Sequence, residues 1–197
     1  MTPEGLGGVA LSITAGIALA AAAGFRAFLP LLVLSAAARL HWLPLHEAAS
    51  FLTGDLAFTA LLVATLLEIL GDKVPMIDHA LDVGGTFVRP AAGFLAGLAV
   101  LADLPEPVRI VLALVLSMLT LGTHVAHAKT RVGSTVLTAG IGNPVLSVLE
   151  DAAAFTLAVL AIFLPIVALG LLLLGAYLLV RFWGALRRRA APESPAS

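Results

Sequence analysis

The sequence predicts an all-α protein that spans a membrane as a bundle of about six helices. Hydrophobic residues make up 60% of the chain, charged residues make up only 12%, and the mean hydropathy is +1.08. In soluble domains about a quarter of the residues are charged. At about 20 apolar residues per crossing, the 197 residues suit about six crossings joined by short connections.

Composition also excludes several classes of function. The chain has no cysteine, which excludes disulfides, thiolate metal sites and cysteine nucleophiles. Its net charge of -1 and the lack of a basic stripe exclude nucleic acid as an expected partner. The N-terminus lacks the basic region and cleavage site of a secretory signal, so we expect the first helix to remain in the mature protein.

The first apolar stretch, residues 9–40, contains only two charged residues, Arg26 and Arg39. As one straight helix it would be about 48 Å long, whereas the hydrocarbon core of a bilayer is about 30 Å thick. Gly24 and Pro30 flank Arg26. We therefore expect this single crossing to kink or break at Arg26, with the freed backbone groups satisfied inside the protein.

The next segments alternate between interface and membrane. Residues 41–55 carry a tryptophan, a proline and several charged side chains, which predicts an interfacial loop, and residues 56–71 predict a second crossing. Residues 74–83 place apolar side chains on one face and aspartates on the other, which predicts a short helix in the interface. Gly84 and Gly85 are expected to end that helix.

A third crossing is expected over residues 90–102, where Gly93 and Gly97 form the GxxxG motif of close helix pairs, within the bundle or across a dimer. The acidic segment 103–107 predicts a tight turn. Three more crossings follow in the second half: one from residue 108 into a polar, glycine-rich region at 123–143, one opened by Asn143 that contains Glu150 and Asp151, and one from residue 166.

Basic residues predict the orientation, because Lys and Arg concentrate on the cytoplasmic side of membrane proteins. With a cytoplasmic N-terminus, only Arg39 and Arg109 fall outside. Eight basic residues fall inside: Lys73, Arg89, Lys129, Arg131, Arg181, Arg187, Arg188 and Arg189. We therefore predict six crossings with both termini in the cytoplasm.

Three crossings per half allow an inverted repeat of residues 1–104 and 105–197 in one membrane domain. Gly24 matches Gly122, and Glu68 matches Glu150. Chance matches in a chain rich in glycine are the alternative.

Four motifs resemble a bacterial family of small integral membrane proteins that is catalogued as a domain of unknown function. They are GFRAFLPL at 24–31, ExxxDKVPxxD at 68–78, TFVRP at 86–90 and GNPVLSVLED at 142–151. The resemblance covers about residues 15–187 and implies the fold and the family membership, without implying an activity. The expected location is the bacterial inner membrane.

A weaker likeness is to the calcium and manganese/proton exchangers, whose two inverted halves each contain Glu-x-Gly-Asp-Lys/Arg-Ser/Thr. The segment from Glu68 to Val74 has one extra residue before Gly71, and Val74 replaces the hydroxyl. The second half has Glu150-Asp151 without the Gly-Asp-Lys. This likeness therefore implies a role as ion ligands for Glu68 and Asp72 only.

The candidate ion-binding residues are carboxylates in apolar surroundings. Glu68 and Asp72, four residues apart, share a helix face, and Glu150 and Asp151 occupy a second helix. Carboxylates bind hard cations, and desolvated ones bind protons. The alternative is that Asp72 lies at the interface beside Lys73, and that Glu68 pairs with Lys73 or Arg89.

Arg26 either binds an anionic substrate or pairs with a carboxylate, for which we expect Glu68 or Glu150. Asn143 either caps its helix or contacts substrate. His124 and His127, at i,i+3, are weak candidates for metal ligands. No cofactor is expected.

Three functions compete. The leading prediction is a small secondary transporter or channel that moves a small cation, divalent or otherwise, in exchange for protons. The second is a non-catalytic scaffold or lipid-interacting protein with internal salt bridges, with the bilayer as its partner. The third is an intramembrane metalloenzyme, and our expectation is that the protein is not an enzyme.

Overall fold

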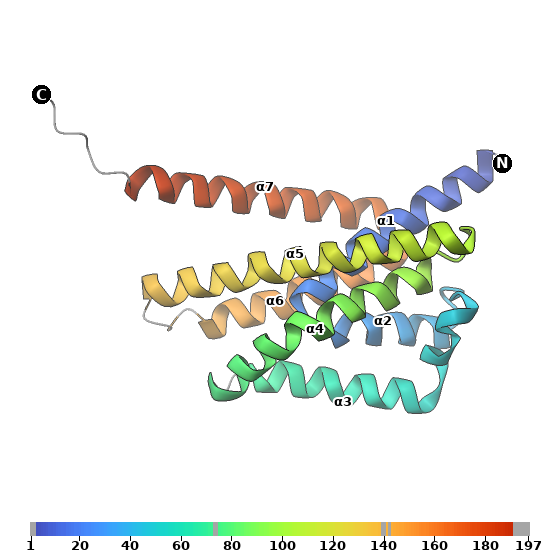
Figure 1. Ribbon diagram of the computed structural model, residues 1–197, viewed down its shortest axis with the longest axis horizontal. Helices are drawn as coiled ribbons and strands as arrows, with labels where there is room; N and C mark the ends of the chain where they lie inside the picture. Colours follow the sequence, from blue (N-terminus) through green and yellow to red (C-terminus); the bar gives the residue numbers. More distant parts are fainter. Residues whose placement is uncertain (1–2, 73–74, 139–140, 142, 191–197) are drawn as a thin grey trace, which may run out of the picture.

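The computed structural model describes residues 3–72, 75–138, 141 and 143–190, with side chains described for residues 6–72, 83–136, 141 and 145–184. This part of the chain is a helical bundle without strands (Figure 1). Its elements are α1 (Pro3–Phe25), α2 (Phe28–Arg39), the 3-10 helix η1 (Glu47–Thr53), α3 (Asp55–Gly71), α4 (Pro75–Val100), α5 (Glu106–Thr138), α6 (Asn143–Phe163) and α7 (Pro165–Ala190).

Length and hydropathy confirm a multi-pass membrane protein. Five helices, α1, α4, α5, α6 and α7, are long and apolar enough to cross a membrane. The pair η1 and α3, bent by 71°, supplies a sixth span if it is counted as one. Helix α2 has only 12 residues, although it is also apolar. The predicted all-α bundle with about six crossings is therefore confirmed.

Helix α1 occupies the centre of the bundle and packs against α4, α5, α6 and α7 (Figure 1). Its alanines from Ala20 to Ala23 are fully buried. Small side chains allow such helices to approach closely. A Cβ atom added at Gly24 would lie 2.8 Å from the carbonyl oxygen of Thr120, and the Thr120 hydroxyl donates to the carbonyl of Ala20 at 2.9 Å.

The chain breaks between α1 and α2, which confirms the break predicted at Arg26. The break reverses the direction of the chain. At one end of the bundle, a Cβ added at Gly8, near the start of α1, would lie 3.9 Å from the Asp103 carboxylate. At that same end, Arg39 closes α2 and pairs with Asp55, the first residue of α3, at 2.7 Å.

Because of this reversal, the chain passes through the bundle an odd number of times, whereas an even number was predicted. Helix α2 returns through the bundle instead of continuing α1, so the start of α1 and the end of α7 lie at opposite ends of the bundle (Figure 1). The predicted layout had residues 9–40 crossing once and both termini on one side. The difference arises from α2, a short helix of 12 residues that is the seventh segment to run through the bundle.

Helix α4 is continuous from Pro75 to Val100 and contains Pro90, where a short helix over 74–83 and a separate crossing from residue 90 were predicted. Gly85 does not end the helix. A Cβ at Gly85 would lie 3.2 Å from Nε of Arg89, so this glycine leaves room for the Arg89 side chain.

Helix α5 is also unbroken, through the polar region to Thr138. The break in the first half therefore has no counterpart in this helix, and the inverted repeat about residue 104 stays a prediction. The GxxxG glycines, Gly93 and Gly97, face Thr120 and Ala113 of α5. This motif is consequently a contact within the bundle and not an open dimer face.

The segment 41–55 contains η1 rather than an irregular loop, and Trp42, which is 60% exposed, packs on Phe163 with ring centroids 5.4 Å apart. The predicted turn at 103–107 and the helix start at Asn143 are confirmed.

Candidate functional site

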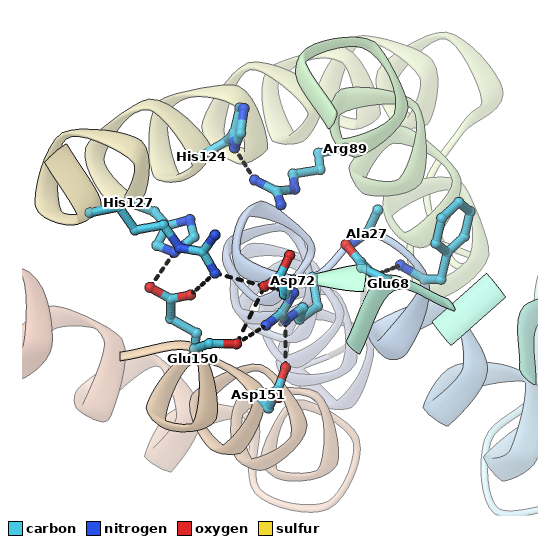
Figure 2. A network of polar contacts seen from close by, with 12 residues as sticks. Ala27, Glu68, Asp72, Arg89, His124, His127, Glu150 and Asp151 are labelled. Carbon is cyan, nitrogen blue, oxygen red and sulfur yellow. Dashed lines mark hydrogen bonds and ion pairs between the residues drawn. The ribbon is translucent and has the colours of Figure 1, made fainter. Parts of the chain in front are cut away.

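Glu68 occupies the break between α1 and α2. Its carboxylate accepts hydrogen bonds from the backbone N–H groups of Ala27 at 2.8 Å and Phe28 at 3.2 Å (Figure 2). These are the first N–H groups of α2, which have no partner within the helix. The side chain of Ala27 cannot cap the helix, so a carboxylate from α3 does so, at the positive end of the helix dipole.

Arg26, in the break itself, is 1% exposed and is surrounded by acceptors from two other helices. One guanidinium nitrogen pairs with Oδ2 of Asp72, and Nε lies 2.5 Å from Oδ1 of Asp151 on α6. The third nitrogen donates to the Ser147 hydroxyl at 3.1 Å. Arg26 therefore joins the end of α3 to the first turns of α6.

Asp72 is shared between two guanidinium groups. Its Oδ2 atom pairs with Arg26 and also lies 2.6 Å from Nη2 of Arg131, on α5. Ser147 donates to the same oxygen at 3.4 Å. Because Asp72 caps the C-terminus of α3, its carboxylate ties α3 to α5 and to the break.

Glu150 lies on the other side of Arg131. Its Oε2 atom accepts from Nη2 of Arg131 at 3.0 Å, and its Oε1 atom contacts Nε2 of His127 (Figure 2). Glu150 and His127 side chains are 4% and 3% exposed. The ring of Phe25, the last residue of α1, stands edge-on to the His127 ring at 5.9 Å between centroids.

A second histidine, His124, meets a cation instead. Its Nδ1 atom contacts Nη1 of Arg89 from α4, and both side chains are buried (Figure 2). Arg89 and Arg26 lie within electrostatic reach of Glu68. We call the set Arg26, Glu68, Asp72, Arg89, Arg131, His124, His127, Ser147, Glu150 and Asp151 the buried network.

Most of the residues predicted for an ion site belong to this network. Arg26 pairs with carboxylates as predicted, but its partners are Asp72 and Asp151, whereas Glu68 and Glu150 were expected. The choice follows from geometry, because Glu68 is held by the backbone of α2 and Glu150 by Arg131. Two residues named in the predictions cannot be placed in this way. The side chain of Asn143 and the whole of Lys73 lie outside the described part of the chain.

Arg131 and Ser147 were missed, and Arg89 was named only as an alternative partner of Glu68. Arg89 and Arg131 were both assigned to the cytoplasmic side, yet they are 2% and 8% exposed. The sequence did contain one indication that Arg131 lies near the candidate site. Arg131 follows His127 by four residues and therefore shares its helix face.

The two histidines do not form a metal site in the described part of the chain. His124 faces a guanidinium group and His127 faces one carboxylate, and no group of three His, Asp or Glu side chains suited to a metal occurs among the described residues. Two recesses lie at the opposite end of the bundle. One of about 240 Å³ borders Leu43 and Ser50, and an open one of about 530 Å³ borders His46 and Arg109.

The family model of a domain of unknown function, DUF4126, matches residues 13–185, which confirms the resemblance drawn from the four motifs. No curated protein and no solved structure matches the chain.

Proposed function

Since the chain belongs to the DUF4126 family, whose function is unknown, we propose from its own geometry that it is a small secondary transporter of the bacterial inner membrane. The observation that supports this proposal is the buried network at the break between α1 and α2. Charged side chains from the break, α3, α5 and α6 meet there, in a bundle that is otherwise apolar.

Such a network costs stability. Charges taken out of water lose several kcal/mol each, and replacement of a buried ion pair by apolar residues is often neutral or stabilising. Ionisable residues inside membrane bundles therefore mark transport paths by default. Discontinuous helices whose ends meet charged groups are the way in which many secondary transporters build their sites.

The ion pairs of the network also restrict which ions can bind to its carboxylates. Asp72, Glu150 and Asp151 already contact guanidinium or imidazole groups, so a cation reaches them only by displacing Arg26, Arg131 or His127. A proton needs no such space. We therefore favour a proton as the coupling ion, with a small cation, such as calcium or manganese, as a transported partner only if the network opens.

Asp72 supplies a way for the network to change state. Its Oδ2 atom is shared by Arg26 from the break and Arg131 from α5. Loss of either contact leaves the other intact, so the α1–α2 break and α5 can separate without leaving Asp72 unpaired. We propose this separation as the step that opens the site.

The reversed break changes the proposed orientation. The exposed basic residues Lys129 and Arg181 belong to the end of the bundle at which α5 and α7 end, whereas the end at which α1 begins has Arg39. We propose that the C-terminus is cytoplasmic and that the N-terminus lies outside, in agreement with the positive-inside rule.

The second candidate, a non-catalytic scaffold, is favoured by a different observation. The carboxylates of Asp72, Glu150 and Asp151 are paired with cationic side chains or imidazole. Buried pairs that only fix the α1–α2 hairpin in place would look the same.

Reconstituted vesicles separate the two candidates. Purified protein in liposomes loaded with a pH dye, or with a calcium or manganese dye, is given a pH step or a cation step. We expect wild type to move protons and Glu150→Gln and Asp72→Asn to lose the flux. Asp55→Asn is the matched control, because Asp55 is an ion-paired carboxylate whose side chain is 93% exposed. Equal flux in all four proteins refutes the carboxylate mechanism, and no flux in any supports the scaffold.

A further inference from the structure

His46 and Arg109 meet at the end of the bundle where α5 begins (Figure 1). His46 directly precedes η1, and its backbone N–H donates to the carbonyl of Ala99, in the last turn of α4, at 3.0 Å. Arg109 lies in the first turn of α5, and its Nη1 atom contacts Nε2 of His46. Both side chains line the open recess of about 530 Å³, which is also lined by Glu47, Ala48 and Glu106.

The ring of His46 faces two hydrogen-bond donors and can accept from only one of them. Its Nδ1 atom accepts from the backbone N–H of Ala48 at 3.0 Å, so this nitrogen carries no hydrogen. A neutral imidazole then carries its hydrogen on Nε2, where it meets a guanidinium group that also only donates. The other tautomer accepts from Arg109 but not from Ala48, and the charged ring accepts from neither. Every protonation state of His46 therefore leaves an N–H group at this point without an acceptor.

Arg109 contacts no carboxylate within the described part of the chain, although it is only 7% exposed. Its Nε atom is buried there without a hydrogen-bond partner. Arg26 and Arg131, by comparison, each contact two carboxylates. A buried charge without a partner is costly, and the first turn of α5 adds to the cost because it is the positive end of the helix dipole. The donors at this recess therefore favour an oxyanion as their ligand.

Two glutamates on the same recess restrict the kind of oxyanion. Glu47 and Glu106 line it, both are exposed, and neither forms an ion pair among the residues whose side chains are described. Their carboxylates repel a ligand that carries only negative charge and attract an ammonium group. A zwitterion satisfies both sets of side chains, with a phosphate for Arg109 and His46 and an ammonium group for the glutamates.

The surroundings favour a membrane lipid as the source of this zwitterion. Val108, Ile110 and Val111 are exposed apolar side chains beside the recess on α5, in a helix that is long and apolar enough to cross the membrane. Trp42, in the connection that leads to η1, is also exposed, and tryptophan is enriched at the level of the lipid headgroups. A headgroup in the recess would therefore have its acyl chains along the apolar surface of α5.

We propose that this recess binds the headgroup of a zwitterionic phospholipid with a primary ammonium group, such as phosphatidylethanolamine. The phosphate accepts hydrogen bonds from Arg109 and His46, and the ammonium group is held by Glu47 and Glu106. The site is independent of the proposed transport, because none of its residues belongs to the buried network.

The test is native mass spectrometry of the full-length protein, stripped of lipid in detergent and titrated with phosphatidylethanolamine or phosphatidylglycerol of the same acyl chains. We expect wild type to bind phosphatidylethanolamine about tenfold more tightly, which corresponds to about 1.4 kcal/mol, because phosphatidylglycerol offers the glutamates no ammonium group. Equal binding of the two lipids by wild type overturns the proposal.

Two variants locate the preference. Arg109→Gln should weaken the binding of both lipids, and Glu47→Gln combined with Glu106→Gln should shift the preference towards phosphatidylglycerol. Arg39→Gln is the matched control, because Arg39 is a basic residue at the same end of the bundle whose ion pair with Asp55 is exposed. A preference that survives in both recess variants refutes the site. The glutamates are exposed, so their variant decides the question if Arg109→Gln fails to fold.

Glycerophosphoethanolamine, the soluble headgroup without acyl chains, distinguishes a lipid from a free zwitterion. If the ligand is a lipid, this compound should displace phosphatidylethanolamine only in large excess, because it lacks the apolar contacts with α5. Displacement at equal concentration would assign the recess to a soluble zwitterion and overturn the lipid site.

Discussion

The carboxylate of Glu68 on α3 accepts a hydrogen bond of 2.8 Å from the backbone N–H of Ala27, where α2 begins. A residue that sequence marks as an ion ligand thus caps a helix that starts in the middle of a bundle. Since Glu68 is 5% exposed, water does not replace it easily.

Glu68→Ala should destabilise the protein by about 1 to 2 kcal/mol, because two N–H groups of α2 lose their acceptor. Glu68→Gln should cost less, since one amide oxygen remains to accept. Melting temperatures in detergent measure both. Asp55→Ala is the control, and its exposed pair with Arg39 is worth about 0 to 1 kcal/mol. Equal melting temperatures for Glu68→Ala and wild type would contradict the cap.

Helix packing at two glycines gives the next prediction. Gly93→Ala forces a methyl group against the side chain of Thr120, and Gly24→Ala forces one against the side chain of Thr123. Each should destabilise by about 1 to 3 kcal/mol. Gly122→Ala is the matched control on α5, where no other side chain lies within 4 Å of the added Cβ, and it should be neutral or stabilising. Thermal unfolding in detergent compares them, and a Gly93→Ala protein as stable as Gly122→Ala would refute the close contact of α4 and α5.

The reversal at the break predicts which positions are accessible from which side of the membrane. The chain has no cysteine, so single cysteines at Ser50 and at Ile141, which is 82% exposed, can be labelled selectively. We expect an impermeant reagent to label Ser50→Cys in intact cells, together with an N-terminal tag, and Ile141→Cys only after lysis. An N-terminal tag that is protected along with Ile141→Cys would restore the layout with one broken crossing.

Sequence alone predicted the fold class, the break at Arg26 and all four acidic members of the network. These follow from local pattern, because a charge within a long apolar run is visible without any tertiary information. It did not predict the direction that the chain takes after the break, since hydropathy is the same for a helix that continues and for one that turns back.

The ion-pair partners of the buried residues could not be predicted from the local sequence pattern either. Asp72 and Asp151 rather than Glu68 and Glu150 pair with Arg26, because the backbone of α2 occupies Glu68 and Arg131 occupies Glu150. Arg89 and Arg131 were counted as surface charges, because a charge count by side assumes that every basic residue lies in a connection. Only the packing of α4 and α5 against α1 buries them.

Arg26 is the residue on which the break, the network and the proposed function all depend. A double-mutant cycle tests its role most directly, with Arg26→Ala, Asp151→Asn and the double variant compared by unfolding in detergent. Removal of one partner of a buried pair costs about 3 to 5 kcal/mol, and removal of both costs less than the sum.

We therefore expect Arg26→Ala to lower the melting temperature strongly and Asp151→Asn to recover part of the loss in the double variant. Arg39→Ala, at an exposed ion pair, is the control and should cost no more than about 1 kcal/mol. An unchanged melting temperature for Arg26→Ala, or effects that simply add with Asp151→Asn, would contradict the account. Arg26 would then be a solvated residue of an open cavity and a direct contact for substrate.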